Sequence, residues 1–381
     1  MVERVGIVAV AQTKYHPNRC DVNEEELSWE SIKPLLEETG LTLWEIESAV
    51  TCSQDFWDGR TISNMNIQHV VGAHLQHEDK VCEDGLNAVY VAMAQILSGH
   101  HDVVLLESHM KESQGEKCAI ENASFDPAML RVLGLDFTSA AAMQAKRYMY
   151  KYGVTAEQLA QVAVRNHANA KNNPFAQEAL DITIDDVLGS KMVSSPIRAL
   201  DAKPISDGSC AMILASEEKA KKLCSKPVWI MGVSNCYEDH YLGDRDLADC
   251  EALVKAAQKA YKMAGIRNPL REIDLAEITT EYSYQEPLWL EGLGFCAKGE
   301  GGRLVNSKAV AMGGKMPVNP SGGVLPGVPN GVAGSSRVAE AVLQLRGEAG
   351  ERQVANAKVA LAHGYTGSCG QHQAVMILGN S

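Results

Sequence analysis

An order of strands and helices that occurs twice constrains the fold of this chain more than any other feature of its sequence. In the first half, an apolar run over 5–10 predicts a buried strand, and 27–39 predicts a helix that ends at Gly40. In the second half, 228–233 predicts a strand and 247–264 a helix, which again ends at a glycine. A short linker and a further strand follow each helix, so the order of the elements agrees as well as their types.

A later pair of elements is repeated too. A helix over 88–97 followed by a strand over 103–106 has its counterpart in 338–345 and 357–362. Together the repeats predict a duplicated α/β unit, in which helices cover a largely buried sheet. The alternative is the plain alternation of strands and helices that every α/β protein shows.

The repeat divides the chain into two expected halves, 1–218 and 219–381. Residues 115–195 have no counterpart in the second half, and their predicted helices and polar stretch indicate a helical insertion, or loop domain, over one face of the sheet. Residues 299–334 are rich in glycine and proline, and we expect a fixed loop whose backbone comes close to a ligand or another loop. A flexible linker is the alternative for this segment.

Charge and cysteine usage exclude several classes of protein. The net charge of −13 argues against a nucleic-acid or anionic-membrane partner, because both bind basic surfaces. The ten cysteines form no Cys-x-x-Cys pair, which argues against a disulfide framework and a structural zinc site. The spacing of His69, His74 and His77 places only the last two on one helical face, so no metal site is predicted. The chain starts as a strand and holds no membrane-spanning window, so we expect a cytoplasmic protein.

Cys82 is the first candidate for a functional side chain. It lies just before an apolar helical run over 86–97 that precedes a strand. A thiol at a helix N-terminus has a lowered pKa, because the helix dipole and the free N–H groups favour the thiolate. The alternative is a small buried hydrophobic side chain, the commoner fate of a cysteine.

Four stretches of the sequence resemble the thiolase superfamily, and most closely its sterol-carrier-protein-like and archaeal type. They are SDGSCA (206–211), AEITTEYS (276–283) with EGLGF (291–295) after it, VNPSGG (318–323) and QLRGEAGERQV (344–354). The resemblance runs through nearly the whole chain. It implies a five-layered αβαβα fold of two duplicated halves with the insertion as a loop domain.

The same resemblance implies the ligands and partners. The substrates are an acyl-CoA and free coenzyme A, which is a co-substrate, and no cofactor is bound permanently. Family members form dimers or dimers of dimers, so a homodimer is expected. Some members of this type also bind a small partner subunit that carries a zinc ribbon and an OB-fold.

By this resemblance Cys82 is the nucleophile of an acyl transfer. Its thiolate attacks the ketone carbon of a 3-ketoacyl-CoA, and free CoA then removes the acyl group. The anionic intermediate needs N–H donors, which we expect from Cys82 itself and from the loop around Gly370. His363 is the expected acid or base, with a solvated loop histidine as the alternative, and Cys369 and His372 in the same loop are the next candidates.

Three departures from the family pattern concern the substrate loops. The family's Gly-His-Pro motif is matched by Gly327 and Val328, and valine cannot accept a proton. Its Asn or His near the thioester oxygen is matched by Thr279, which offers only a hydroxyl. Glu281, next to Tyr282 in the same motif, is either a replacement base or an ion-paired carboxylate.

The residues after the nucleophile depart as well. Glu83 and Asp84 replace small uncharged residues, and carboxylates beside a thiol raise its pKa unless they are paired. These changes leave two functional interpretations. One is thiolytic cleavage of an unusual aryl or branched 3-ketoacyl-CoA, such as benzoylsuccinyl-CoA. The other is a catalytically weak scaffold or acyl-CoA-binding subunit of a multi-protein complex.

Overall fold

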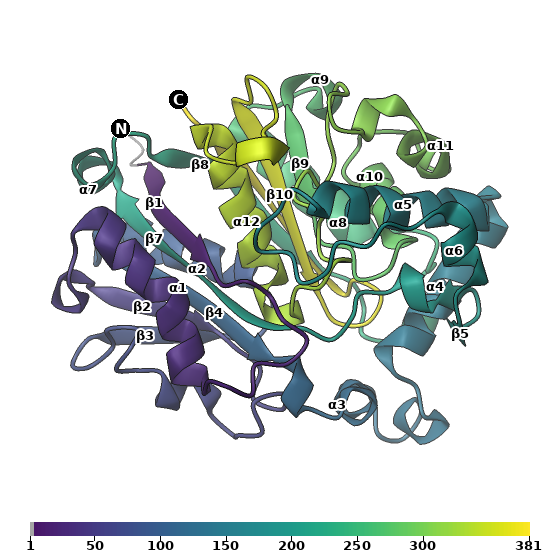
Figure 1. Ribbon diagram of the computed structural model, residues 1–381, viewed down its shortest axis with the longest axis horizontal. Coiled ribbons are helices and arrows are strands. Elements are labelled where there is room, and N and C mark those ends of the chain that lie inside the picture. Colours follow the sequence, from purple (N-terminus) through teal and green to yellow (C-terminus); the bar gives the residue numbers. More distant parts are fainter. Residues whose placement is uncertain (1–3) are drawn as a thin grey trace.

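The structure, a computed structural model that describes residues 4–381, is a mixed α/β fold around one nine-stranded sheet (Figure 1). The strands lie in the order β3-β2-β4-β7-β1-β8-β11-β10-β9. Their bounds are β1 (Val5–Gln12), β2 (Ser48–Cys52), β3 (His77–Val81), β4 (Val103–Lys111), β7 (Asp207–Ser216), β8 (Val228–Tyr237), β9 (Leu275–Ile278), β10 (Val359–Thr366) and β11 (His372–Gly379). β1 pairs with β8 at Gly6 and Ile7, and this short pairing joins the strands of the first half to those of the second. The predicted α/β class is confirmed.

Helices cover both parts of this sheet and also lie between them. Their bounds are α1 (Glu24–Thr39), α2 (Gly85–Leu97), α3 (Lys117–Ala123), α4 (Phe137–Tyr152), α5 (Ala156–Ala170), α6 (Ile184–Gly189), α7 (Glu217–Leu223), α8 (Glu251–Ala264), α9 (Pro269–Glu272), α10 (Gln285–Gly292), α11 (Gly301–Val305) and α12 (Asn330–Arg346). α1 packs on β1, β4 and β7, whereas α8 packs on β8 and β11. α2 and α12 pack against each other between the two parts of the sheet (Figure 1). These layers form the five-layered αβαβα arrangement that the resemblance implied.

Strand side chains divide between the layers by simple alternation. Along β7, Met212 and Leu214 belong to the core around α2 and α12, and Ile213 and Ala215 belong to the core under α1. Successive residues of a strand point to opposite faces, so a strand buried on both faces is apolar throughout. This explains why the strands appear in the sequence as continuous apolar runs.

Helix ends agree with their capping residues. Asn23 caps α1 and forms a capping box with Glu26, so this helix starts three residues before the expected Leu27. Gly40 and Gly265 end α1 and α8 in the left-handed conformation, as expected.

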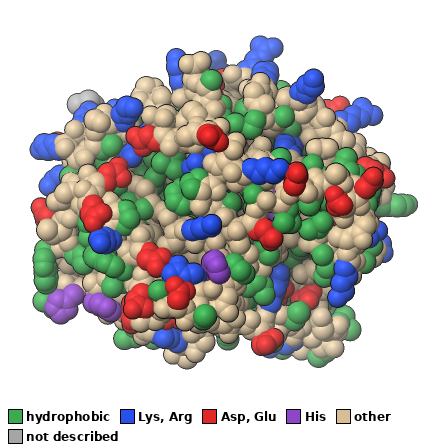
Figure 2. Space-filling view, in the orientation of Figure 1, with side chains coloured by type: hydrophobic (Ala, Val, Ile, Leu, Met, Phe, Trp, Pro, Cys, Tyr) green, Lys and Arg blue, Asp and Glu red, His purple; other side chains and the backbone are tan. Residues whose placement is uncertain are grey.

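The insertion is helical, as expected. It holds α3 to α6 and a small two-stranded sheet of β5 (Met192–Ser194) and β6 (Ile197–Arg198). Buried side chains of α4 and α5 share a core with α8 and α10. On the face shown in Figure 2, acidic and basic side chains are interspersed. None of the helices formed by residues 4–381 combines the length and the apolar character needed to cross a membrane.

The expected loop over 299–334 is partly wrong, because α12 already begins at Asn330. Gly331 and Gly334 are therefore helical. A side chain at Gly334 would overlap the carboxylate of Asp84 at the start of α2. The glycine is present because α2 and α12 approach each other closely here, which single-sequence composition cannot distinguish from a loop signal.

Candidate active site

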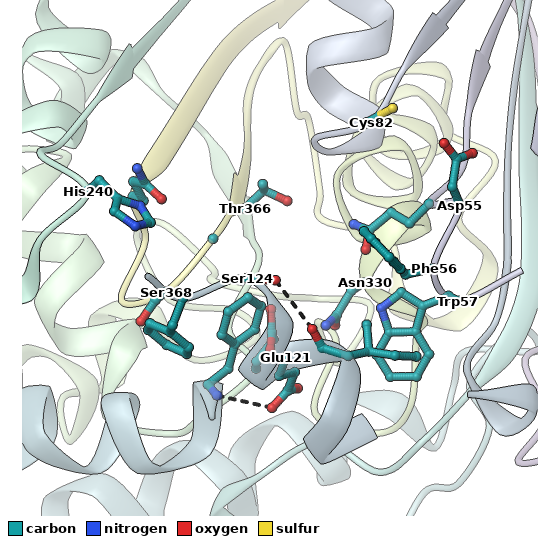
Figure 3. Close-up of a pocket in the computed structure, with 17 residues that line it drawn as sticks. Asp55, Phe56, Trp57, Cys82, Glu121, Ser124, His240, Asn330, Thr366 and Ser368 are labelled. Carbon is teal, nitrogen blue, oxygen red and sulfur yellow. Dashed lines mark hydrogen bonds between the residues drawn. The ribbon is translucent and has the colours of Figure 1, made fainter. Parts of the chain in front are cut away.

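A cavity of about 360 Å³ opens beside the start of α2, and Cys82 lines it (Figure 3). Aromatic side chains form much of its wall: Phe56, Trp57, Phe125 and Phe137. Its carboxylates are Asp55, Glu121 and Glu281, and its neutral polar groups include Gln54, Ser124, Asn330, Thr366, Ser368 and Gln371. Of the ten cysteines, Cys82 is the one that contributes to this wall.

The N-terminus of α2 is occupied by Asp84 rather than by the thiol. Asp84 is fully buried and accepts hydrogen bonds from the Leu86 N–H at 2.9 Å and from the Gly334 N–H at 2.8 Å. Burial raises the pKa of Asp84 to about 7. The helix-terminal donors are thus directed at a carboxylate, and Cys82 lies two residues before this cap.

Cys82 is exposed, but its pKa lies above the ordinary thiol value. Partial burial by the neighbouring walls is the largest cause; the ammonium of Lys80 opposes it, and Asp55 and Glu83 add to it. The expectation of a lowered thiol pKa is therefore wrong, because Asp84 caps the helix and carboxylates flank the sulfur. Cys82 needs a proton acceptor to become a thiolate near neutral pH.

The carboxylate of Glu83 has partners of its own. It accepts from the Tyr237 hydroxyl at 3.1 Å and from the Asn87 amide at 3.3 Å. Its backbone oxygen accepts from the Thr366 hydroxyl at 2.9 Å. These bonds connect the Cys82 turn to the ends of β8 and β10.

His363 lies on the far face of the sheet from Cys82. β10 runs on to Thr366, so His363 is inside the strand, on the face of Leu361 and Tyr365, whereas the other face packs against α2. Its Nε2 lies 2.7 Å from the Gln373 side-chain oxygen, and burial lowers its pKa to about 4. The catalytic role of His363 stays a prediction, and this placement gives it no contact with the cavity.

His372 and Cys369 lie closer to the cavity but behind its wall. His372 begins β11 on the face that packs against α2, and its ring stacks on Tyr237 with centroids 4.4 Å apart. Burial lowers the pKa of His372, and Glu83 opposes this. Cys369 is buried in the loop between β10 and β11, where burial raises its thiol pKa to about 11. The Gly370 N–H donates to the Gly367 oxygen at 3.3 Å within that loop, so this donor is already used.

The substrate-loop residues are also mostly turned away from the cavity. The Thr279 hydroxyl donates to the His363 backbone oxygen at 2.9 Å, and the Tyr282 hydroxyl lies 2.9 Å from that of Thr138. Gly327 has a left-handed φ of 102°, and Val328 is buried in the central core. None of these reaches the cavity wall formed by the described residues. Glu281, between Thr279 and Tyr282, does reach it.

Two wall residues were missed from the sequence. Asn330 follows Val328 by two positions at the start of α12, and its side-chain oxygen is buried without a hydrogen-bond partner. Glu121 lies on α3 of the insertion, where burial raises its pKa to about 7. The position of Asn330 next to the Gly-His-Pro counterpart was a usable signal. No signal marked Glu121, because its place in the wall depends on how the insertion packs.

No metal centre accompanies these residues. Within 4–381, no three His, Cys, Asp or Glu side chains are arranged to hold a metal ion.

Comparisons with known proteins cover the whole of this fold. The family model "Thiolase, N-terminal domain" matches residues 5–218, and "Thiolase C-terminal domain-like" matches 234–380. The chain is 35% identical to the acetyl-CoA acetyltransferase of Methanothermobacter thermautotrophicus, over 96% of this chain and 97% of that protein. It is 32% identical to the benzoylsuccinyl-CoA thiolase subunit BbsB of Thauera aromatica, over 76% of each. A solved structure titled "Ltp2-ChsH2(DUF35) aldolase" matches 99% of this chain and 98% of that chain, with a TM-score of 0.84 and 26% identity.

Proposed function

The chain belongs to the thiolase superfamily of CoA-dependent acyltransferases, and from this premise we propose that it cleaves a 3-ketoacyl-CoA by thiolysis through an acyl-Cys82 intermediate. The observation that carries the proposal is the position of Cys82, whose thiol lines a cavity large enough for an acyl group. Coenzyme A is the co-substrate.

The proposed reaction has two halves. In the first, the Cys82 sulfur bonds to the ketone carbon, and the carbon–carbon bond breaks to release an acyl-CoA. In the second, the sulfur of free CoA bonds to the acyl carbon and Cys82 leaves. Asn330 and Thr366 supply polar groups at the wall where negative charge develops on the oxygen.

The cavity wall supports an aryl or branched acyl group. Trp57 and Phe125 are buried, and the rings of Phe125 and Phe137 meet edge to face with centroids 5.8 Å apart. Aromatic walls favour a flat apolar group through contact area and ring stacking. The similarity to BbsB makes benzoylsuccinyl-CoA the first specific substrate to test.

We also propose a homodimer that binds a small partner subunit with a zinc ribbon and an OB-fold. The support is the wording of two relatives, because BbsB is named as a subunit and the matched aldolase structure as a complex with ChsH2.

Peptide mass spectrometry tests the nucleophile. The protein is incubated with aryl and branched 3-ketoacyl-CoA substrates, with and without CoA. We expect an acyl adduct on Cys82 that free CoA removes, loss of thiolysis in Cys82→Ala, and normal thiolysis in the control Cys20→Ala, which changes another exposed cysteine. Full thiolysis by Cys82→Ala would refute the assignment. Absence of cleavage across the panel, with the partner subunit present, would favour the scaffold alternative.

A further inference from the structure

A buried cluster of charged side chains forms the side of the cavity contributed by the insertion. Its members are Glu112, Lys117, Glu121, Lys203 and Glu281, and Glu112, Glu121 and Glu281 are each less than a tenth exposed. Glu121 and Glu281 line the cavity itself, together with Cys82. The cluster combines residues from three distant parts of the chain, so it exists only in the folded protein.

One carboxylate of the cluster is fully paired. Lys203 Nζ lies 2.8 Å from Glu112, and Glu112 also accepts from the backbone N–H groups of Ser206 at 3.0 Å and Asn330 at 2.9 Å. A carboxylate with a cation and two N–H donors is stable as an anion. Glu112 and Lys203 therefore neutralise each other.

The other two carboxylates share one remaining ammonium group. Lys117 Nζ lies 3.8 Å from Glu121, and its charge also acts on Glu281. Two buried carboxylates beside one cation leave one unbalanced negative charge, which a single proton removes. Burial raises the pKa of both groups; Glu121 reaches about 7, with Glu281 adding to the shift and Lys117 opposing it.

The remaining groups around the two carboxylates do not supply the missing positive charge. The Phe137 N–H donates to Glu121 at 3.1 Å, and Asp136 beside it adds negative charge. On the Glu281 side, the Tyr365 hydroxyl opposes the shift that Lys203 also opposes and that Glu112 increases. One oxygen of Glu121, Oε1, is buried without a hydrogen-bond partner among the described residues. That oxygen is available to a proton, to a water or to a substrate.

We propose that Glu121 and Glu281 share one proton and form the acid–base pair of the thiolysis. This inference rests on the proposed function. Other candidates are placed less well, because Val328 cannot hold a proton and His363 lies on the opposite face of the sheet. Figure 3 shows Glu121 and Cys82 on different sides of the cavity, which leaves the space between them for the reacting groups.

The proton balance of the two half-reactions is as follows. The pair first takes the Cys82 proton, and the resulting thiolate bonds to the ketone carbon. When the carbon–carbon bond breaks, its electron pair stays on the α-carbon of the departing acyl-CoA, and the pair gives that carbon its proton. The pair then takes the proton of the CoA thiol, whose sulfur bonds to the acyl carbon. The bond to Cys82 breaks with its electrons on the Cys82 sulfur, which restores the thiolate and the protonated pair.

The pH profile of thiolysis is the discriminating measurement. Below about pH 7 the pair already holds its proton while Cys82 is still a thiol, so the wild-type rate falls with decreasing pH. Glu121→Gln removes this acidic limb and lowers kcat about a hundredfold, with little change in KM. Glu281→Gln gives a second, independent test of the same limb. The control Glu116→Gln changes an exposed carboxylate just before α3 and leaves rate and profile unchanged.

The outcomes separate the two proposals. If wild-type protein forms acyl-Cys82, and either folded variant, checked by circular dichroism, keeps the wild-type rate and acidic limb, the pair is refuted while the proposed function stands. If wild-type protein forms no acyl-Cys82 with any substrate, the proposed function fails first. Loss of the limb together with slow turnover of acyl-Cys82 in both variants supports the pair.

Discussion

The contact between α2 and α12 positions the Cys82 turn, and substitution of Gly334 tests this contact directly. The Gly334 N–H donates to Asp84 at 2.8 Å, and a side chain at this position would overlap the Asp84 carboxylate and approach the Leu86 nitrogen to 2.6 Å. Gly334→Ala therefore forces α2 and α12 apart and breaks a buried hydrogen bond to a charged group. Gly331, one turn earlier, has nothing closer than 3.7 Å to such a side chain.

The magnitude follows from three contributions. A lost hydrogen bond to a buried carboxylate costs about 1.5–3 kcal/mol. Overpacking costs about 1–3 kcal/mol more, whereas alanine in a helix gains about 1 kcal/mol over glycine. We expect Gly334→Ala to lower the free energy of unfolding by roughly 2–5 kcal/mol, and Gly331→Ala to raise it by about 1 kcal/mol.

Urea denaturation followed by circular dichroism measures both variants, at pH 8 so that Asp84 is mainly charged. The rate at which iodoacetamide modifies Cys82 reports on the turn itself. We expect Gly334→Ala to change this rate and Gly331→Ala to leave it unchanged. If the two variants were equally stable, the close approach of α2 and α12 would not be the reason for glycine at position 334.

Two further predictions concern charges. Because the pKa of Cys82 is raised, its alkylation by iodoacetamide at pH 7 should be slower than that of a free cysteine and should increase steadily with pH; a rate independent of pH between 7 and 9 would contradict this. Glu286 is fully buried and pairs with Arg165, so Glu286→Gln leaves a buried cation unpaired and should cost about 3–5 kcal/mol in urea denaturation. The control Glu218→Gln breaks only an exposed pair with Lys222 and should change stability by less than about 1 kcal/mol.

Much of the fold could be predicted because it depends on local patterns. Apolar runs marked the buried strands, and Gly40 and Gly265 marked the helix ends that the structure confirms. The repeated order of elements was visible without any alignment. The resemblance motifs placed Cys82 next to a helix start, where the structure has it at the cavity wall.

The face to which His363 points could not be predicted in the same way. β10 was expected to end before this residue, but pairing of Thr366 with His372 on β11 extends the strand. One further pair of strand residues decides which side of a sheet a side chain faces, because the alternation has a period of two. That pairing is a contact between two strands, and neither strand encodes it alone.

The sequence by itself determined the α/β class, the repeated strand and helix order, and the thiol at a helix start, because each depends on neighbouring residues. Only the tertiary structure decided the electrostatics of that thiol. Asp84 occupies the helix terminus because α12 presents the Gly334 N–H to it. Glu121 and Glu281 lie 160 positions apart and become one buried pair because the insertion packs against the loop after β9. A pKa depends on burial and on charges in space, and neither is a property of local sequence.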